Sequence, residues 1–197
     1  MIDLSDTVAS VNERMDALEK MREKAIASSR SVIRMTKKAI HAIHSGESHK
    51  ELLKNAMTEY KAMCKACSEP EILFSGPVGD AMMELAEACI LSSIVLKKPV
   101  PSYVSINVTP QAWVLGLADC LGEMRRILLT QLMAGKIKDA KEMFADMERV
   151  CDHVMSFDVP DAVLPIRRKQ DVARSVMERT RTDIANAVLM DNAKLKF

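Results

Sequence analysis

Aromatic and turn-forming residues are scarce in this chain. Only 4% of its 197 residues are aromatic, and it contains 6 glycines and 7 prolines. Strands favour aromatic and β-branched side chains and are joined by frequent turns, so this composition argues against a sheet-based fold. The many Ala, Met, Leu, Lys and Glu residues instead predict an all-α protein.

Long apolar runs are also missing. No segment reaches the roughly 18 uninterrupted apolar residues of a transmembrane helix. The N-terminal MIDLSDTVAS lacks the positive and then apolar segments of a signal peptide. The odd count of 5 cysteines indicates reduced thiols. We therefore expect a cytoplasmic protein without a membrane partner.

Two further absences limit the chemistry. Cys64 and Cys67 form an isolated C-x-x-C with no second ligand pair at a suitable spacing, so we interpret them as small apolar residues rather than a zinc site. No Glu has a His three residues later, which leaves no di-iron motif. The net charge of +1 does not itself indicate nucleic acid, although it can hide charged patches.

The apolar spacing predicts six helices in one domain, residues 1–197. The first pattern, 5–44, would span roughly 60 Å, so it either wraps a partner subunit or breaks near Ala27–Ser29. A connection at 68–79 can hold a short helical turn, which would make a seventh helix. The other helices are expected at 48–67, 80–97, 110–134, 136–156, and from 161 or 165 to 189.

Two acids stand out in the stretch AWVLGLADCLGEM, residues 112–124. Thr109 and Pro110 are typical of a helix start, and Gly135 of a helix end. A helix that is apolar all round is normally buried, yet Asp119 and Glu123 lie four residues apart on one face of it. Carboxylates are rarely buried unless they are paired, protonated or bound to a metal. These two acids therefore need a partner.

A second acidic stripe occurs in residues 80–97. Asp80, Glu84 and Glu87 lie within about 60° of one another on a helix, and the stripe continues into apolar residues. We therefore expect the Glu87 end to point inward. If this helix packs against residues 110–134, the carboxylates of both helices converge, which suits Mg²⁺ or Mn²⁺.

Simpler interpretations of these acids remain open. An E-x-x-E is often a solvated face, and Asp119 and Glu123 can pair with arginines of the last helix. Arg126, one turn beyond Glu123, can either pair with it or contact phosphate.

Basic residues are concentrated in two places. No acid occurs between Lys24 and Ser45, where one helix face carries basic residues at steps suited to a phosphate backbone. The start of the last helix is also basic, which opposes its dipole and suggests phosphate contact or pairing with buried acids. Few aromatics are present for stacking on bases, so we expect backbone-led binding. The residues on that face are Arg30, Arg34, Lys37, His41 and His44. Lys38 is a further basic residue of this window, and the last helix carries Arg167, Arg168 and Lys169.

One motif resembles a known family. Residues 108–123 read V-T-P-x-x-W-x-x-G-x-A-D-x-x-G-E, followed by Arg126. This pattern is similar to the translin family and, within it, to the branch of translin-associated factor X (TRAX). The resemblance extends to Arg30, to E-L-A-E-A at 84–88 and to the basic last helix, and so covers essentially the whole chain.

The resemblance implies an antiparallel all-α bundle of seven helices that assembles into a hollow octamer. Family members bind single-stranded RNA or DNA on the inner surface. TRAX-type subunits are Mg²⁺-dependent endoribonucleases, whereas translin subunits bind without cutting. Carried over, the catalytic and metal-binding acids are Glu84, Glu87 and Asp119, with Glu123 as a neighbouring ligand.

The chain departs from eukaryotic TRAX in being shorter and in lacking a bipartite nuclear-localisation segment. It therefore resembles an archaeal homologue that forms a homo-oligomer. The leading hypothesis is a metal-dependent endoribonuclease acting on short single-stranded RNA. One alternative is a non-catalytic binder of single-stranded RNA or DNA. Another is a structural helical oligomer whose buried acids pair with arginines.

Overall fold

The computed structural model describes residues 4–67, 69, 72 and 76–194, which form helices and no strand. The predicted all-α fold is confirmed. Six of the twelve residues of the connection predicted at 68–79 lie outside the described residues, and its last four are helical. The helices are α1 (Ser5–His44), α2 (Lys50–Ala66), α4 (Gly76–Val95), α5 (Pro110–Met133), α6 (Ile137–Met155) and α7 (Arg167–Lys194).

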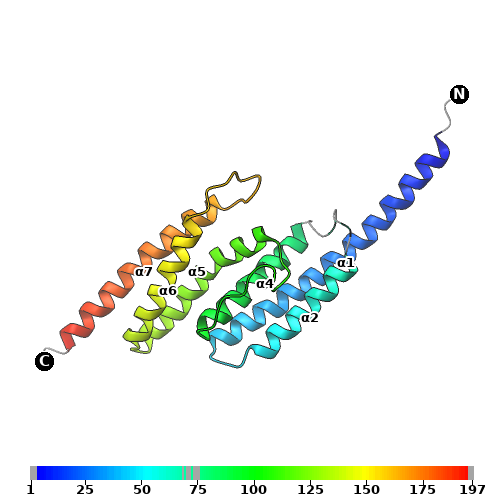
Figure 1. The fold of residues 1–197 in the computed structure, drawn as a ribbon. Helices are drawn as coiled ribbons and strands as arrows, with labels where there is room; N and C mark the ends of the chain where they lie inside the picture. The colour runs from blue at the N-terminus through cyan, green and yellow to red at the C-terminus, as the bar shows by residue number, and fades with distance from the viewer. Residues whose placement is uncertain (1–3, 68, 70–71, 73–75, 195–197) are drawn as a thin grey trace.

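The helices lie side by side in an elongated bundle with α4 and α5 at its centre (Figure 1). Helix α4 packs on α1 and α5, whereas α5 packs on α4, α6 and α7. Buried residues occur on every side of α4 because α1 and α5 cover it from different directions. Any side chain at the α4–α5 contact therefore lies close to the middle of the molecule.

Both ends of α5 follow the predicted signals. The hydroxyl of Thr109 accepts a hydrogen bond from the backbone N–H of Ala112 at 3.2 Å, and Pro110 is the first helical residue. Gly135 follows the helix with a φ of +71°, a conformation that glycine adopts without a steric penalty. These caps fix the register in which α5 presents Asp119.

Helix α1 is continuous, so the alternative of a break near Ala27–Ser29 is wrong. Ser29 is buried and its hydroxyl donates to the Met63 sulfur of α2 at 3.3 Å. The N-terminal part of α1 projects beyond the bundle (Figure 1), and Val8, Val11 and Met15 are exposed there.

The largest other differences from the predicted helix boundaries are in α4 and α7. Helix α4 begins at Gly76, earlier than the expected residue 80, because Pro77 is tolerated within a first turn. Helix α7 begins at Arg167 and runs to Lys194, beyond the expected end at 189. None of the described helices has the length and apolar character needed to cross a membrane.

Candidate acidic site and its basic surroundings

The acidic stripe of α4 runs from solvent into the core. Asp80 is exposed, Glu84 is half-buried, and Glu87 is only 9% exposed. The inward direction predicted for Glu87 is therefore confirmed. Its carboxylate has no hydrogen bond or ion pair among the described residues, which leaves a costly buried acid to be explained.

A glycine brings the second acid pair against the first. A Cβ added to Gly116 of α5 would lie 2.7 Å from the Met83 carbonyl oxygen and 2.8 Å from the Glu87 nitrogen of α4. The two backbones are thus in direct contact at this point. Asp119 follows Gly116 by about one turn on α5, so it lies on the same side of the helix.

The four carboxylates interact electrostatically. Burial and, in decreasing order, the charges of Asp119, Glu84 and Glu123 together raise the pKa of Glu87 from 4.5 to about 8, against an opposing effect of the Lys169 charge. Burial also raises the pKa of Glu84, an effect that Lys37 opposes. The predicted convergence of the α4 and α5 acids therefore appears in the structure.

Three of these acids have a basic neighbour from another helix. The Lys169 amine of α7 contacts both carboxylate oxygens of Asp119, at 2.5 and 2.6 Å. Lys37 of α1 lies 3.7 Å from Glu84. The alternative in which α7 pairs with a buried acid is thus realised for Asp119, although by a lysine and not by an arginine.

His44 is the partner of Glu123. Its Nε2 forms a very short contact with Glu123 Oε2, and its side chain is 7% exposed. His44 was predicted to lie on the basic stripe, but its contact with Glu123 was not predicted. The two residues are 79 positions apart. The one available signal was that His44 follows Lys37 by two helical turns on the same face of α1.

The donor chemistry of this cluster fits a hard divalent cation. Glu84, Glu87, Asp119 and Glu123 supply carboxylate oxygens, and an added positive charge would relieve their repulsion. In the part of the chain that the structure describes, no three acid, His or Cys side chains are already arranged around one ion position. Instead, Glu84, Asp119 and Glu123 each contact a basic side chain of another helix. The metal assignment stays a prediction.

The basic stripe of α1 borders a hollow of about 690 Å³ between α1 and α2. It is also lined by Ile33, Ala42, Leu52 and the acid Glu47, and its Lys37 lies 3.7 Å from Glu84. The structure therefore gathers all four basic residues of α1 that were predicted to bind nucleic acid. These residues are Arg30, Arg34, Lys37 and Lys38, and His41 lies beside them.

The basic residues of α7 divide into two environments. Arg168 and Lys169 line a hollow of about 460 Å³ together with Asp119. Arg167 is exposed and lies 3.6 Å from Asp161. Arg126 of α5 is exposed and does not pair with Glu123 among the described residues. The alternative in which Arg126 contacts phosphate stays a prediction.

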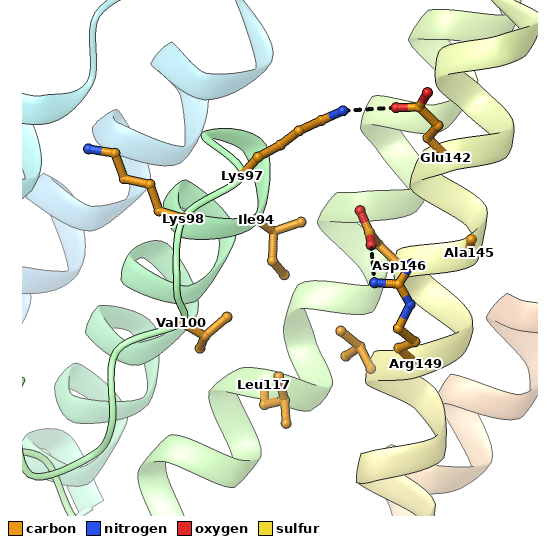
Figure 2. Close-up of a pocket in the computed structure, with 10 residues that line it drawn as sticks. Ile94, Lys97, Lys98, Val100, Leu117, Glu142, Ala145, Asp146 and Arg149 are labelled. Atoms are coloured by element: carbon orange, nitrogen blue, oxygen red, sulfur yellow. Dashed lines mark hydrogen bonds and ion pairs between the residues drawn. The ribbon is translucent and has the colours of Figure 1, made fainter.

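A further hollow of about 540 Å³ lies between the end of α4, α5 and α6 (Figure 2), and none of the four acids of the cluster lines it. Lys97 pairs with Glu142 at 2.8 Å, and Arg149 pairs with Asp146 at 3.1 Å. Lys98 points away from the hollow (Figure 2). Because Lys97 and Arg149 already pair with carboxylates, we do not expect this hollow to bind an anionic ligand strongly.

Comparison with solved structures identifies the fold and the family. AfC3PO, a C3PO of the translin/TRAX type, is 32% identical to this chain, with a TM-score of 0.85. The match covers 93% of this chain and 98% of the AfC3PO chain. The chain belongs to the translin family. AfC3PO in a complex with duplex RNA, another translin-family structure, matches with 31% identity and a TM-score of 0.87, over 93% of this chain and 97% of that chain.

Two other comparisons extend this result. Apo-NeC3PO shares the translin-family fold, with a TM-score of 0.80 at 18% identity, over 91% of this chain and 96% of that chain. An uncharacterized protein of Methanocaldococcus jannaschii is 29% identical over 182 residues, which cover 90% of this translin-family chain and 80% of the relative. No family model matches the chain.

Proposed function

We propose that the chain is a metal-dependent endoribonuclease of the TRAX-like branch that cleaves short single-stranded RNA. The observation that carries this proposal is the buried, unpartnered carboxylate of Glu87 beside three further acids, with basic residues on both sides. The resemblance implies that translin-type subunits lack these acids, so their presence favours the catalytic branch. AfC3PO supports RNA as the ligand class because it forms a complex with duplex RNA.

Glu84, Glu87 and Asp119 would hold Mg²⁺ or Mn²⁺, with Glu123 as a neighbouring ligand. When bound, such an ion supplies a Lewis acid that lowers the pKa of water and offsets charge on a phosphodiester. The chain itself binds and positions the strand. Lys37 lies between the acids and the hollow of α1, so a phosphate held there would be next to the carboxylates.

The strand would follow the basic residues of α1 and α7. Backbone contacts of this kind bind nucleic acid with little sequence preference and with strong salt dependence. Single-stranded DNA is the alternative ligand, because the contacts reach phosphate and not the 2′-hydroxyl. The proposed contacts are Arg30, Arg34, Lys37, Lys38, Arg126, Arg167, Arg168 and Lys169.

A homo-octamer is the proposed assembly. Its support is the projecting end of α1, where Val8, Val11 and Met15 are exposed at helical spacing. The Methanocaldococcus jannaschii relative matches 90% of this chain and AfC3PO matches 93%, which favours an archaeal homologue. Measuring the mass in solution with and without RNA tests the octamer directly.

The deciding experiment is cleavage of a labelled RNA in Mg²⁺ by the wild type and by Glu87→Gln. We expect cleavage of a single strand by the wild type and none by the variant. A labelled duplex of the same sequence, tested in parallel, checks the preference for single strands. Equal cleavage by both proteins contradicts the assigned site.

A second candidate is a translin-like protein that binds single strands without cutting them. The observation in its favour is that Lys169, Lys37 and His44 already contact three of the four acids. If this second candidate is correct, we expect salt-sensitive RNA binding and no cleavage in Mg²⁺ or Mn²⁺.

A further inference from the structure

One basic side chain at the acid cluster, Lys169, occupies the atoms that a metal would need. The Lys169 amine lies 2.5 and 2.6 Å from the two carboxylate oxygens of Asp119, so both oxygens are engaged at once. A charge-assisted contact of this kind is among the stronger hydrogen bonds in proteins. Asp119 can bind an ion fully only when Lys169 moves away.

Lys169 has room to move. Its side chain is 27% exposed and that of Asp119 is 32% exposed, so water reaches the pair. The neighbouring hollow of about 460 Å³ is lined by Gly122 and Arg168 as well as by these two residues. A Cβ at Gly122 would meet nothing within 4 Å, which leaves open space on the α5 side.

Phosphate would give Lys169 a different partner. Lys169 is the third residue of α7, next to the exposed Arg167 and Arg168. The first turn of a helix favours an anion, whereas three consecutive basic residues there are unfavourable without one. An RNA phosphate at this position would therefore attract the Lys169 amine away from Asp119.

We propose that Lys169 is a positioning residue that competes with the divalent metal for Asp119 and is released by RNA, so that RNA and metal bind cooperatively. The inference rests on the proposed function, because it assumes the metal site. By linkage, RNA raises metal affinity by the same factor by which metal raises RNA affinity. Without RNA, Lys169 keeps the acid cluster closed to metal.

The test is Mn²⁺ binding to the full-length chain, followed by the loss of the free-ion signal in electron paramagnetic resonance. A 2′-O-methyl RNA oligonucleotide, which resists cleavage, serves as the strand. We compare the wild type with Lys169→Met and Lys169→Gln. Lys61→Met is the matched control, because Lys61 is exposed on α2 away from the acids.

In the wild type we expect RNA to increase Mn²⁺ affinity roughly tenfold, a typical coupling between two sites. In both Lys169 variants, Mn²⁺ should bind about that much more tightly without RNA, and the effect of RNA should largely disappear. The Lys61 variant should behave as the wild type. Circular dichroism melting curves check that the variants are folded, and Lys169→Gln keeps a polar side chain if Lys169→Met is poorly stable.

Failure of this inference is distinguishable from failure of the proposed function. If Mn²⁺ binds with equal affinity to the wild type and both Lys169 variants, and Glu87→Gln abolishes the binding, the competition is overturned while the metal site stands. If Mn²⁺ binds to none of these proteins with or without RNA, the proposed metal site is overturned and the competition with it.

Discussion

Gly116 on α5 lies directly against the Met83 carbonyl on α4, where an added Cβ would stand 2.7 Å from the oxygen. Two helices approach this closely only where one of them carries no side chain. Because Asp119 follows on the same side of α5, the Gly116–Met83 contact sets how near the acids of the two helices come. Gly116 therefore affects both the packing of α4 on α5 and the spacing of the acids.

We expect Gly116→Ala to lower the free energy of unfolding by about 1–3 kcal/mol, because the new methyl group must push the helices apart. Urea denaturation measures the change. Gly122→Ala is the matched control, since a Cβ there meets nothing within 4 Å. It should raise stability by up to about 1 kcal/mol through a better helix propensity. A Gly116→Ala protein as stable as the wild type would contradict this packing.

Glu87 predicts a pH-dependent stability. Its pKa is about 8 in the folded protein against 4.5 as the ordinary value, so between these pH values the folded chain binds more protons than the unfolded chain. The contribution of Glu87 to the free energy of unfolding should therefore be most favourable below about pH 4.5, and it should fall as the pH rises to about 8.

Glu87→Gln should remove most of this decline in metal-free solution. We expect the variant to exceed the wild type by on the order of 2–4 kcal/mol near pH 8 and to match it at low pH. Urea denaturation across the pH range measures both curves. Asp80→Asn is the control, because Asp80 is exposed at the outer end of the same stripe. Parallel curves for wild type and Glu87→Gln would rule out a proton held at Glu87.

His44 ties α1 to α5 through Glu123, so His44→Ala should leave a partly buried carboxylate without its partner. We expect a loss of about 1–3 kcal/mol in the free energy of unfolding. His41→Ala is the control, since His41 is exposed one turn earlier on the same helix. Equal stability of the two variants would show that the His44–Glu123 contact contributes little.

The basic hollow of α1 predicts the salt dependence of RNA binding. Arg34→Ala combined with Lys38→Ala should reduce the slope of log affinity against log salt by about 2, since each lost phosphate contact lowers it by about 1. Fluorescence anisotropy of a labelled single strand measures the slope. The Lys61→Ala variant should retain the wild-type slope. An unchanged slope in the double variant would place the strand elsewhere.

Local signals explain why much of the fold could be predicted. Helix periodicity, the Thr109 cap and Gly135 depend on neighbouring residues, and each is found as expected. The inward direction of Glu87 also follows from local information, because the acidic stripe continues into apolar residues. The convergence of the α4 and α5 acids required only the assumption that the two helices pack together.

The partners of the acids could not be predicted in the same way. The contact between Lys169 and Asp119 spans 50 residues, and that between His44 and Glu123 spans 79. Both depend on the relative rotation of helices that pack through many side chains, which no short pattern records. The sequence also left open whether α1 breaks, because the buried bond of Ser29 to α2 is a tertiary contact.

The unbroken course of α1 has a mechanical consequence. Forty residues make a rod of roughly 60 Å, with Val8 and Val11 on its projecting end and Lys37 and His44 near its other end. In the proposed homo-oligomer, a neighbouring subunit that packs on the apolar end of α1 would hold one end of this rod, and the other end carries the proposed phosphate contacts and the partner of Glu123. Because α1 is unbroken, the packing of that neighbour would set the direction in which the basic hollow faces.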